Sequence, residues 1–337
     1  MRSGLLAAGN WIRDHVKTVD TWPEQDGLAN ILDHADGNGG GPYNVLKDLS
    51  KLKAPFPLAG MGLVGDDDDG RAILADCAAC GIDTARMRTA AESRTSYTDV
   101  MTVRSTARRT FFHDRGANAL LGPEHFDFVG AGARLFYLGY LLLLDRLDAP
   151  GPGGAPLALD VLRRAGEAGL VTCVDCVSSS SDRFRSTVLP VLPEIDVFFV
   201  NDFEAEQVTG LSLGRGASLD RRAVEAAARA LVGFGVRRWA VLHFPEGACA
   251  CSRQGEVVWQ PSVSVPPELI AGPVGAGDAL AAGVLFGVHE GWPMGRSLEL
   301  GACTAAVSLL HSTCSGSILP CDECLAFGRR HGFVALA

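Results

Sequence analysis

The segment Gly275-Ala276-Gly277-Asp278 places small residues and a carboxylate at the start of a predicted helix, since residues 279–288 are small or apolar. The first N–H groups of a helix lack intrahelical partners and carry the positive end of the dipole, so the glycines could let a phosphate approach the main chain. Asp278 could then be a general base beside a transferred phosphoryl group, or a carboxylate that only complements the helix dipole. The segment alone leaves both interpretations open.

The elements that must position this segment follow an alternating pattern from about residue 117 onward. Apolar, β-branched runs alternate with Ala/Leu/Arg-rich helical patterns, which predicts a parallel sheet covered by helices on both faces. The predicted strands are Leu135–Tyr140, Leu170–Val177, Asp196–Val200 and Trp239–His243, and the predicted helices are Leu157–Ala168, Asp202–Thr209, Asp220–Phe234, Gly277–His289 and Met294–His311.

Residues 95–113 differ from this pattern. They form two short polar-alternating runs separated near Ser105–Ala107, which is typical of a β-hairpin. We therefore expect a hairpin that projects from the α/β body.

Composition limits the function. Thirty Lys and Arg against 39 Asp and Glu give a net charge of −9, which disfavours nucleic-acid or anionic-membrane binding. The chain shows no targeting segment, and its longest apolar stretch, Leu135–Leu144, is about half the roughly 20 residues needed to span a bilayer. We expect a cytoplasmic protein whose ten cysteines, including three Cys-x-x-Cys pairs, are reduced and fill apolar space.

Two nucleotide-binding motifs are excluded. The four lysines end at Lys53 and do not fit a phosphate loop, which argues against P-loop enzymes. The run Gly60–Gly65 imitates a dinucleotide fingerprint, but four aspartates, Asp66–Asp69, follow where a pyrophosphate would need bare amides. We interpret it as a strand end that leads into a helix.

Gly275–Asp278 resembles the C-terminal signature of the ribokinase family, the PfkB-type sugar and nucleoside kinases. Gly39–Asn44 is similar to the family's Gly-Gly-x-x-x-Asn motif, and Asn201–Glu204 to its Asn-x-x-Glu motif. Asp14 and Gly247 also fall at expected positions. The resemblance runs from about residue 8 to 320, and three motifs in register are far more specific than one.

The resemblance implies a three-layer αβα sandwich with a mostly parallel, doubly wound sheet and a small β lid. Residues 1–337 would form one domain, with the lid contributed by roughly 12–44 and 94–115. It also implies that Asp278 takes the proton from an acceptor hydroxyl, while the amides of Gly275, Ala276 and Gly277 hold the charge of the moving phosphoryl group. An exposed lid offers edges through which a homodimer could form.

The resemblance further implies ATP and Mg²⁺ as cofactors. Asn201 and Glu204 would act on Mg²⁺ through water, and Gly247 would border the nucleotide. Asn followed three residues later by Glu also fits a helix capping box, so a purely structural role stays open for this pair.

On the acceptor side, Asp14 and Asn44 are the candidates for sugar hydroxyls, and Gly39 and Gly40 would let the substrate approach the main chain. Alternatively, Asp14 is a solvated loop acid, Asn44 is a helix cap and the glycines form a flexible turn.

The sequence departs from the family pattern at two positions. Gly272-Pro273-Val274 replaces the usual Asp-Thr-x, and since that Asp helps to hold a monovalent cation in relatives, K⁺ dependence is not predicted here. His243–Gly247 keeps only the glycine of a Thr-x-Gly turn beside the nucleotide. The serines Ser178–Ser181 after Asp175 are interpreted as a loop without a catalytic role.

Two arginines and four histidines are interpreted as having no part in chemistry. Arg109 and Arg115 are interpreted as solvated lid charges rather than as ligands for a substrate carboxylate or phosphate. His113, His243, His289 and His311 lack metal-ligand spacing and are interpreted as core-edge or surface residues.

The leading hypothesis is an ATP-dependent sugar kinase. A nucleoside kinase is one alternative, favoured if aromatic side chains, Tyr43 or Tyr97 among them, line the acceptor pocket. A catalytically idle sensor of sugar or nucleotide is the other.

Overall fold

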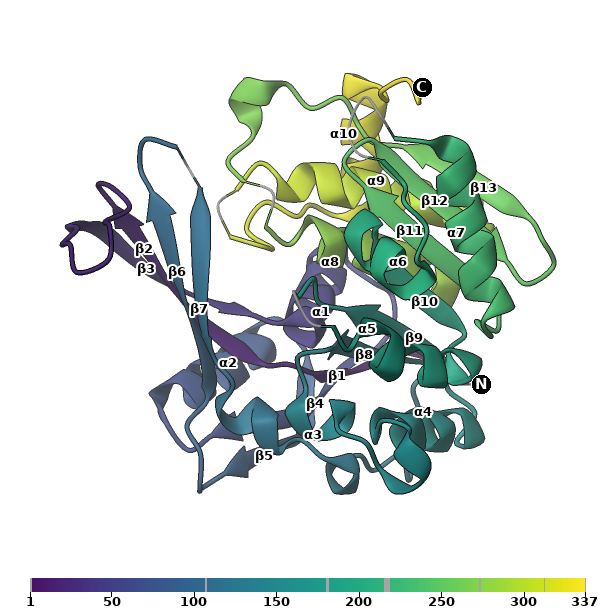
Figure 1. Cartoon of the computed structure of the whole chain (residues 1–337), viewed down its shortest axis with the longest axis horizontal. Coiled ribbons are helices and arrows are strands. Elements are labelled where there is room, and N and C mark those ends of the chain that lie inside the picture. The colour runs from purple at the N-terminus through teal and green to yellow at the C-terminus, as the bar shows by residue number, and fades with distance from the viewer. Residues whose placement is uncertain are drawn as a thin grey trace.

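A computed structural model describes residues 2–106, 108–179, 182–214, 219–272, 274–311 and 313–336. Its main feature is a nine-stranded sheet in the order β13-β12-β11-β10-β9-β8-β1-β4-β5, parallel from β11 to β5 with antiparallel β12 and β13 at one edge (Figure 1). The strands are β1 (Leu5–Gly9), β4 (Leu58–Gly65), β5 (Asp83–Ala90), β8 (Leu135–Leu141), β9 (Val171–Cys176), β10 (Val197–Asn201), β11 (Trp239–Phe244), β12 (Gly247–Ser252) and β13 (Val257–Pro261).

Helices cover both faces of this sheet and bury two apolar cores. One face carries α4 (Ala158–Glu167), α5 (Phe184–Val188), α6 (Asp202–Thr209) and α7 (Arg221–Gly233), and the other carries α1 (Gly41–Lys51), α2 (Asp68–Ala79), α8 (Ala276–Glu290), α9 (Met294–Ser308) and α10 (Cys321–His331). Leu6 and Ala8 of β1 face the first core, while Leu5 and Ala7 face the second, as the alternation of a strand requires. The predicted αβα fold is confirmed, and each predicted strand and helix lies within a few residues of its expected ends.

Helix α8 is buried almost all around because it packs between α1 and α9. Gly283 of α8 lies so close to α9 that a Cβ there would be 2.6 Å from the Cα of Gly301. The small residues of α8 therefore let the two helices approach, and this packing fixes the position of the α8 N-terminus.

A separate four-stranded sheet, which we call the lid, projects from the body (Figure 1). Its order is β3-β2-β6-β7, with β2 parallel to β6 and the outer pairs antiparallel. The bounds are β2 (Ile12–Val19), β3 (Ile31–Gly39), β6 (Ser96–Val103) and β7 (Arg109–Asp114).

The predicted hairpin is confirmed, since Val100 of β6 lies opposite Phe111 of β7. Ala107 of its predicted turn lies outside the described residues. Residues 41–44, expected at the end of the lid segment, form the first turn of α1.

The glycines of the excluded dinucleotide motif have a packing role. Gly60 and Gly62 lie in β4 against the Trp11 side chain, and a Cβ at Gly60 would be 2.7 Å from the indole ring. Asp67 then caps α2 through the N–H of Gly70. The glycines thus make room for a buried tryptophan.

All ten cysteines are free thiols. None of the helices in the described ranges is long and apolar enough to cross a membrane.

Candidate functional site

A cavity of about 600 Å³ lies between the lid and the carboxyl ends of the central strands, and we call it the lid cavity. Such an edge is where open α/β sheets bind ligands. Among the residues predicted for the site, the cavity is lined by Asp14, Gly40, Asn44, Asn201, Glu204, Gly275, Ala276, Gly277 and Asp278. Side chains separated by more than 260 positions in the sequence therefore share one space.

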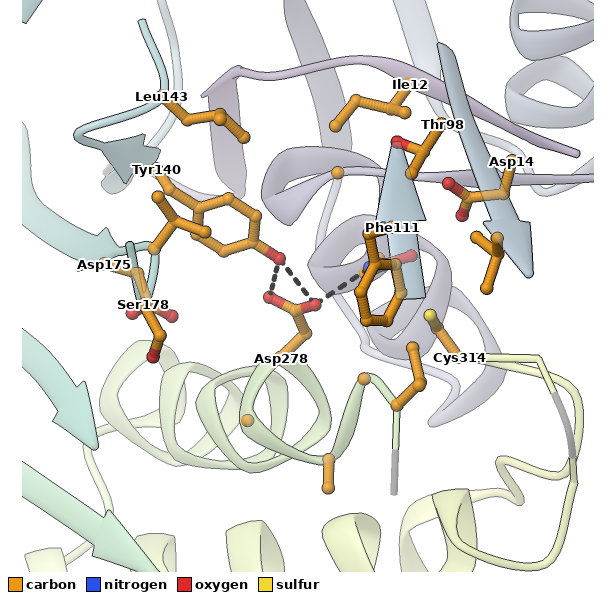
Figure 2. A pocket seen from close by; sticks show the side chains of 18 of the residues that line it. Ile12, Asp14, Thr98, Phe111, Tyr140, Leu143, Asp175, Ser178, Asp278 and Cys314 are labelled. Atoms are coloured by element: carbon orange, nitrogen blue, oxygen red, sulfur yellow. Dashed lines mark hydrogen bonds between the residues drawn. The ribbon is translucent and has the colours of Figure 1, made fainter. Parts of the chain in front are cut away.

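Asp278 lies in the first turn of α8 and is held from two sides (Figure 2). Tyr140 Oη donates to both of its carboxylate oxygens at 2.7 Å, and Asn44 Nδ2 donates to Oδ2 at 2.8 Å. Burial raises the pKa of Asp278 to about 6, although the hydrogen bonds from Tyr140 and Asn44 lower it. The result is an oriented carboxylate that is ionised at pH 7 and is more basic than an exposed aspartate.

Asn44 has a second polar atom available, because its Oδ1 is buried without a hydrogen-bond partner. A buried amide oxygen that lacks a partner is costly, and a hydroxyl in the lid cavity would supply one.

The glycines around Asp278 are dictated by backbone geometry. Gly275 is the N-cap residue of α8 and has a φ of 82°. A Cβ at this position would be 2.6 Å from the Cβ of Cys314. Gly40, with φ 94°, precedes α1, where a Cβ would collide with the carbonyl oxygen of Asn10. Both positions need left-handed backbone and a close approach that only glycine allows.

Gly39 does not line the lid cavity. It stands beside Asp14, and a Cβ at Gly39 would collide with the Asp14 carboxylate. Gly39 therefore leaves space for the side chain of Asp14, which faces the cavity from β2. Burial raises the pKa of Asp14 to about 7.

Asn201 and Glu204 form the capping box that the sequence also allowed. Asn201 Oδ1 accepts from the Glu204 N–H, and Glu204 Oε2 accepts from the Asn201 N–H, both at 2.9 Å. The pair nevertheless lines the lid cavity, so capping and ligand binding do not exclude each other.

Asp175 lies beside this pair, and sequence reasoning did not assign it to the site. Burial and the charges of Glu204 and Asp278 raise its pKa, and burial raises the pKa of Glu204 to about 7. Several carboxylates that are costly to ionise together form a cluster that a hard divalent cation would stabilise. The donor set of Asp175, Asn201 and Glu204, all oxygen, fits Mg²⁺ in this respect.

The prediction that Arg109 is a solvated lid charge is wrong. Arg109 is half-buried and lines the lid cavity. Its Nη2 is 3.0 Å from where a Cβ of residue 272 would stand, so Gly272 makes room for the guanidinium. The sequence did show that a glycine, Gly272, replaces the family's aspartate. Nothing in the sequence, however, indicates that Gly272 lies beside Arg109 of β7. Pro273, the next residue of that departure, lies outside the described ranges, as do Ser180 and Ser181. Arg115, in contrast, pairs with Asp145 at 3.3 Å and does not line the cavity.

Three further residues of the site were missed. The sequence pattern indicates only that Tyr140 ends a strand. It indicates only that His243 and His113 are core-edge or surface histidines. His243 lines the lid cavity, and burial lowers its pKa to about 4, so it is a neutral imidazole at pH 7. His113 lies beside Thr98, with Nδ1 3.0 Å from Oγ1, while its Nε2 is buried without a hydrogen-bond partner.

The aromatic side chains named for a nucleoside pocket lie elsewhere. The Tyr43 hydroxyl donates to Asp76, and Tyr97 packs against His15 at a ring distance of 5.6 Å. Neither lines the lid cavity, where Phe111 is the aromatic residue that the described part of the lid provides.

A second cavity of about 520 Å³ adjoins the first. It is lined mainly by apolar residues, with Gly247 at its border, and the two cavities share Asn201, His243, Ala276 and Gly277. A Cβ at Gly247 would collide with the carbonyl oxygen of Gln260 on β13, which explains the glycine. The N-terminus of α8 thus stands between the two cavities.

Comparison with known proteins identifies the family and the fold. The model of the pfkB family carbohydrate kinases matches residues 6–320. An ATP-dependent ribose-1-phosphate kinase of Halopiger xanaduensis is 28% identical over 303 residues, covering 89% of this chain and 90% of the relative. A 5-dehydro-2-deoxygluconokinase of Geobacillus kaustophilus is 24% identical over 308 residues, covering 87% and 85%. The structure of Arabidopsis thaliana ribokinase complexed with ribose and ATP superposes with a TM-score of 0.79 at 19% identity, covering 98% of this chain and 99% of that one.

Replacing Asp14 by Asn should stabilise the protein without ligands at high pH. The unfolded chain releases the Asp14 proton near the ordinary pKa of about 4, whereas the folded protein keeps it up to about pH 7. Ionisation therefore destabilises the folded state progressively between these values. We expect urea unfolding to give similar stabilities for both proteins near pH 4. At pH 8 the Asn variant should be more stable by up to about 4 kcal/mol, because each of the roughly three pKa units is worth about 1.4 kcal/mol. A difference that does not grow with pH would contradict the assigned burial of this carboxylate.

Proposed function

Because the chain belongs to the PfkB family of carbohydrate kinases, we propose that it transfers the terminal phosphoryl group of ATP to a hydroxyl of a sugar that also carries an anionic group. The observation that carries the proposal is the position of Asp278, an oriented and partly basic carboxylate at a helix N-terminus between two cavities. Family membership makes the chain a phosphotransferase with a hydroxyl acceptor, which sets aside the idle sensor.

In this proposal Asp278 accepts the proton of the attacking hydroxyl. Its pKa of about 6 keeps it ionised at pH 7 and close to the pH at which a general base is most effective. Tyr140 and Asn44 hold the carboxylate in place, so little reorganisation is needed when the hydroxyl attacks.

The backbone amides at Gly275, Ala276 and Gly277 stabilise the charge on the phosphoryl oxygens. They lie at the positive end of the α8 dipole, and small side chains let the phosphate approach them.

The nucleotide would occupy the second cavity, whose apolar side chains suit a flat base and whose shared wall brings the phosphates to the α8 N-terminus. Gly247 would border the base, and His243, as a neutral imidazole, could hydrogen-bond a phosphate without adding charge.

Asn201 and Glu204, together with Asp175, would hold Mg²⁺, in part through water. When bound, Mg²⁺ neutralises charge on the ATP phosphates. The residues themselves supply the oxygen ligands and keep them oriented through the capping box and Ser178, whose Oγ donates to Glu204 at 2.8 Å. K⁺ dependence is still not predicted, and the Arg109 guanidinium beside Gly272 supports this view.

On the acceptor side, Asp14 and Asn44 would bind sugar hydroxyls. Arg109 and His113 face the same cavity from β7 and supply a positive charge and a spare ring nitrogen, which favours a phosphate or carboxylate on the sugar. The two relatives described above are named for substrates of this kind, ribose-1-phosphate and 5-dehydro-2-deoxygluconate. A nucleoside acceptor stays the alternative: Tyr43 and Tyr97 do not line the lid cavity, but two other aromatic side chains, Phe111 and Tyr140, do.

Replacing Asp278 by Asn should lower kcat by at least about 10³-fold and leave the Kd for ATP within about twofold, because the amide cannot accept the proton. Asp322→Asn is the matched control: Asp322 is also a first-turn carboxylate, in α10. Steady-state ADP release and nucleotide titration measure both effects. Equal activity of the two variants would mean that Asp278 serves only the helix dipole.

Replacing Arg109 by Gln should raise the KM of a sugar phosphate or sugar acid by about 10–100-fold, the usual worth of one charge-assisted hydrogen bond. The KM of a neutral sugar should change little. Arg108→Gln, an exposed neighbour in the same hairpin, is the control. A screen across sugar phosphates, sugar acids, neutral sugars and nucleosides would identify the acceptor, and a preference for neutral sugars that survives in Arg109→Gln would contradict the anionic class.

A homodimer through the lid stays a prediction. It is supported by exposed apolar lid residues, including Ile31, Phe112 and the Trp22 ring stacked on Phe112 at 6.2 Å. Sedimentation should give a dimer that Phe112→Ser weakens, and a wild-type monomer at micromolar concentration would contradict it.

A further inference from the structure

The outer face of the lid, opposite the lid cavity, carries a cluster of His15, His34 and Asp36. His15 of β2 lies directly opposite Asp36 of β3 in the antiparallel ladder, and His34, two residues before Asp36, is on the same face. Asp14, next to His15, faces the lid cavity instead. The cluster is thus separate from the kinase site but only one residue from it in the chain.

We propose that His15, His34 and Asp36 form a binding site for a divalent transition-metal ion such as Zn²⁺. His15 Nδ1 is 2.8 Å from Asp36 Oδ1, His34 Nε2 is 3.2 Å from the same oxygen, and the three ligand atoms all lie within 4.8 Å of one another. Ligands of a tetrahedral Zn²⁺ are about 3.4 Å apart, so only small side-chain rotations separate this arrangement from a coordinating one. Two imidazoles and one carboxylate would leave a fourth position for water.

The orientation of His15 supports a metal ligand. Its second ring nitrogen, Nε2, lies 3.5 Å from Asp69 Oδ2 on α2. A carboxylate behind a ligating histidine is the usual outer-shell partner, because it fixes the tautomer that leaves the other nitrogen free to bind. Asp69 comes from the acidic run Asp66–Asp69, in which Asp67 caps α2 and both Asp66 and Asp68 pair with Arg71.

Arg13 lies within the same network and limits the expected affinity. Its Nη2 is 3.3 Å from Asp36 Oδ2 and its Nε is 3.4 Å from Asp69 Oδ1, so it contacts the oxygens that the histidines do not use. The guanidinium therefore orients both carboxylates, while its charge opposes a cation nearby.

Metal binding would tie β3 to β2. Strand β3 is an edge strand, and its residues 31–36 are exposed, so it is among the least protected parts of the lid. The same strand pair continues through Asp14 opposite Gly37 to Ile12 opposite Gly39. An ion at the cluster would thus restrain the strands that present Asp14. The effect on the acceptor rests on the proposed function, but binding of the ion does not.

The test is calorimetric titration of Zn²⁺ into the chelator-treated full chain. Wild type and the control His331→Ala, a histidine outside the lid at the end of α10, should bind one ion with equal Kd. His34→Ala and Asp36→Asn should raise that Kd at least tenfold, and Asp69→Asn, which removes only the outer-shell partner, about tenfold. His34 is exposed, so its loss does not endanger folding.

A second readout locates the ion without using activity. Zn²⁺ should slow amide hydrogen exchange in residues 31–39 of wild type but not of His34→Ala, and Co²⁺ should give visible bands without the charge-transfer band of a thiolate ligand. Equal Zn²⁺ affinity in wild type and His34→Ala, or a thiolate band that persists in His34→Ala, would overturn the proposal and assign the metal to cysteines.

Discussion

The site depends on the burial of one carboxylate, Asp278, at the N-terminus of α8. Burial raises its pKa, and the hydrogen bonds from Tyr140 and Asn44 oppose that effect, which leaves a pKa of about 6. The donors come from the end of β8 and from α1, so the position of the carboxylate depends on how the large sheet and two helices pack. The close contact of Gly283 with Gly301 sets where α8 begins.

The lid supplies the site with one acidic and one basic side chain. It contributes Asp14 from β2 and Arg109 from β7, and both residues line the same cavity. The replacement of the family's aspartate by Gly272 is then physically consistent, since the space and the negative charge that the aspartate would have brought are exchanged for a guanidinium. Under the proposed function, this exchange distinguishes the cavity from one built only for neutral hydroxyls.

The sequence predicted those parts of the fold and site that depend on local order. The Gly275–Asp278 segment, the Asn201–Glu204 cap and the hairpin are each encoded by adjacent residues. Periodicity predicted the four strands β8 to β11 of the nine-stranded sheet, together with helices α4 and α6 to α9. Tyr140, Arg109, Asp175 and His243 were missed because their roles arise only when distant segments meet. Tyr140 is 138 positions from the carboxylate that it orients, and its pattern in the sequence is that of an ordinary strand residue. Arg109 was misread because a basic residue on a short strand is normally solvated, and only the packing against Gly272 shows otherwise.

The central claim is that Asp278 accepts the proton with a pKa set by burial against two hydrogen bonds. The most direct measurement is the pH dependence of kcat/KM for the wild type and for Tyr140→Phe. The account predicts an acidic limb near pH 6 in the wild type, because activity needs the ionised carboxylate, and a limb displaced to higher pH in Tyr140→Phe, because the lost hydrogen bond favoured that form. A limb at the same pH in both proteins would contradict it.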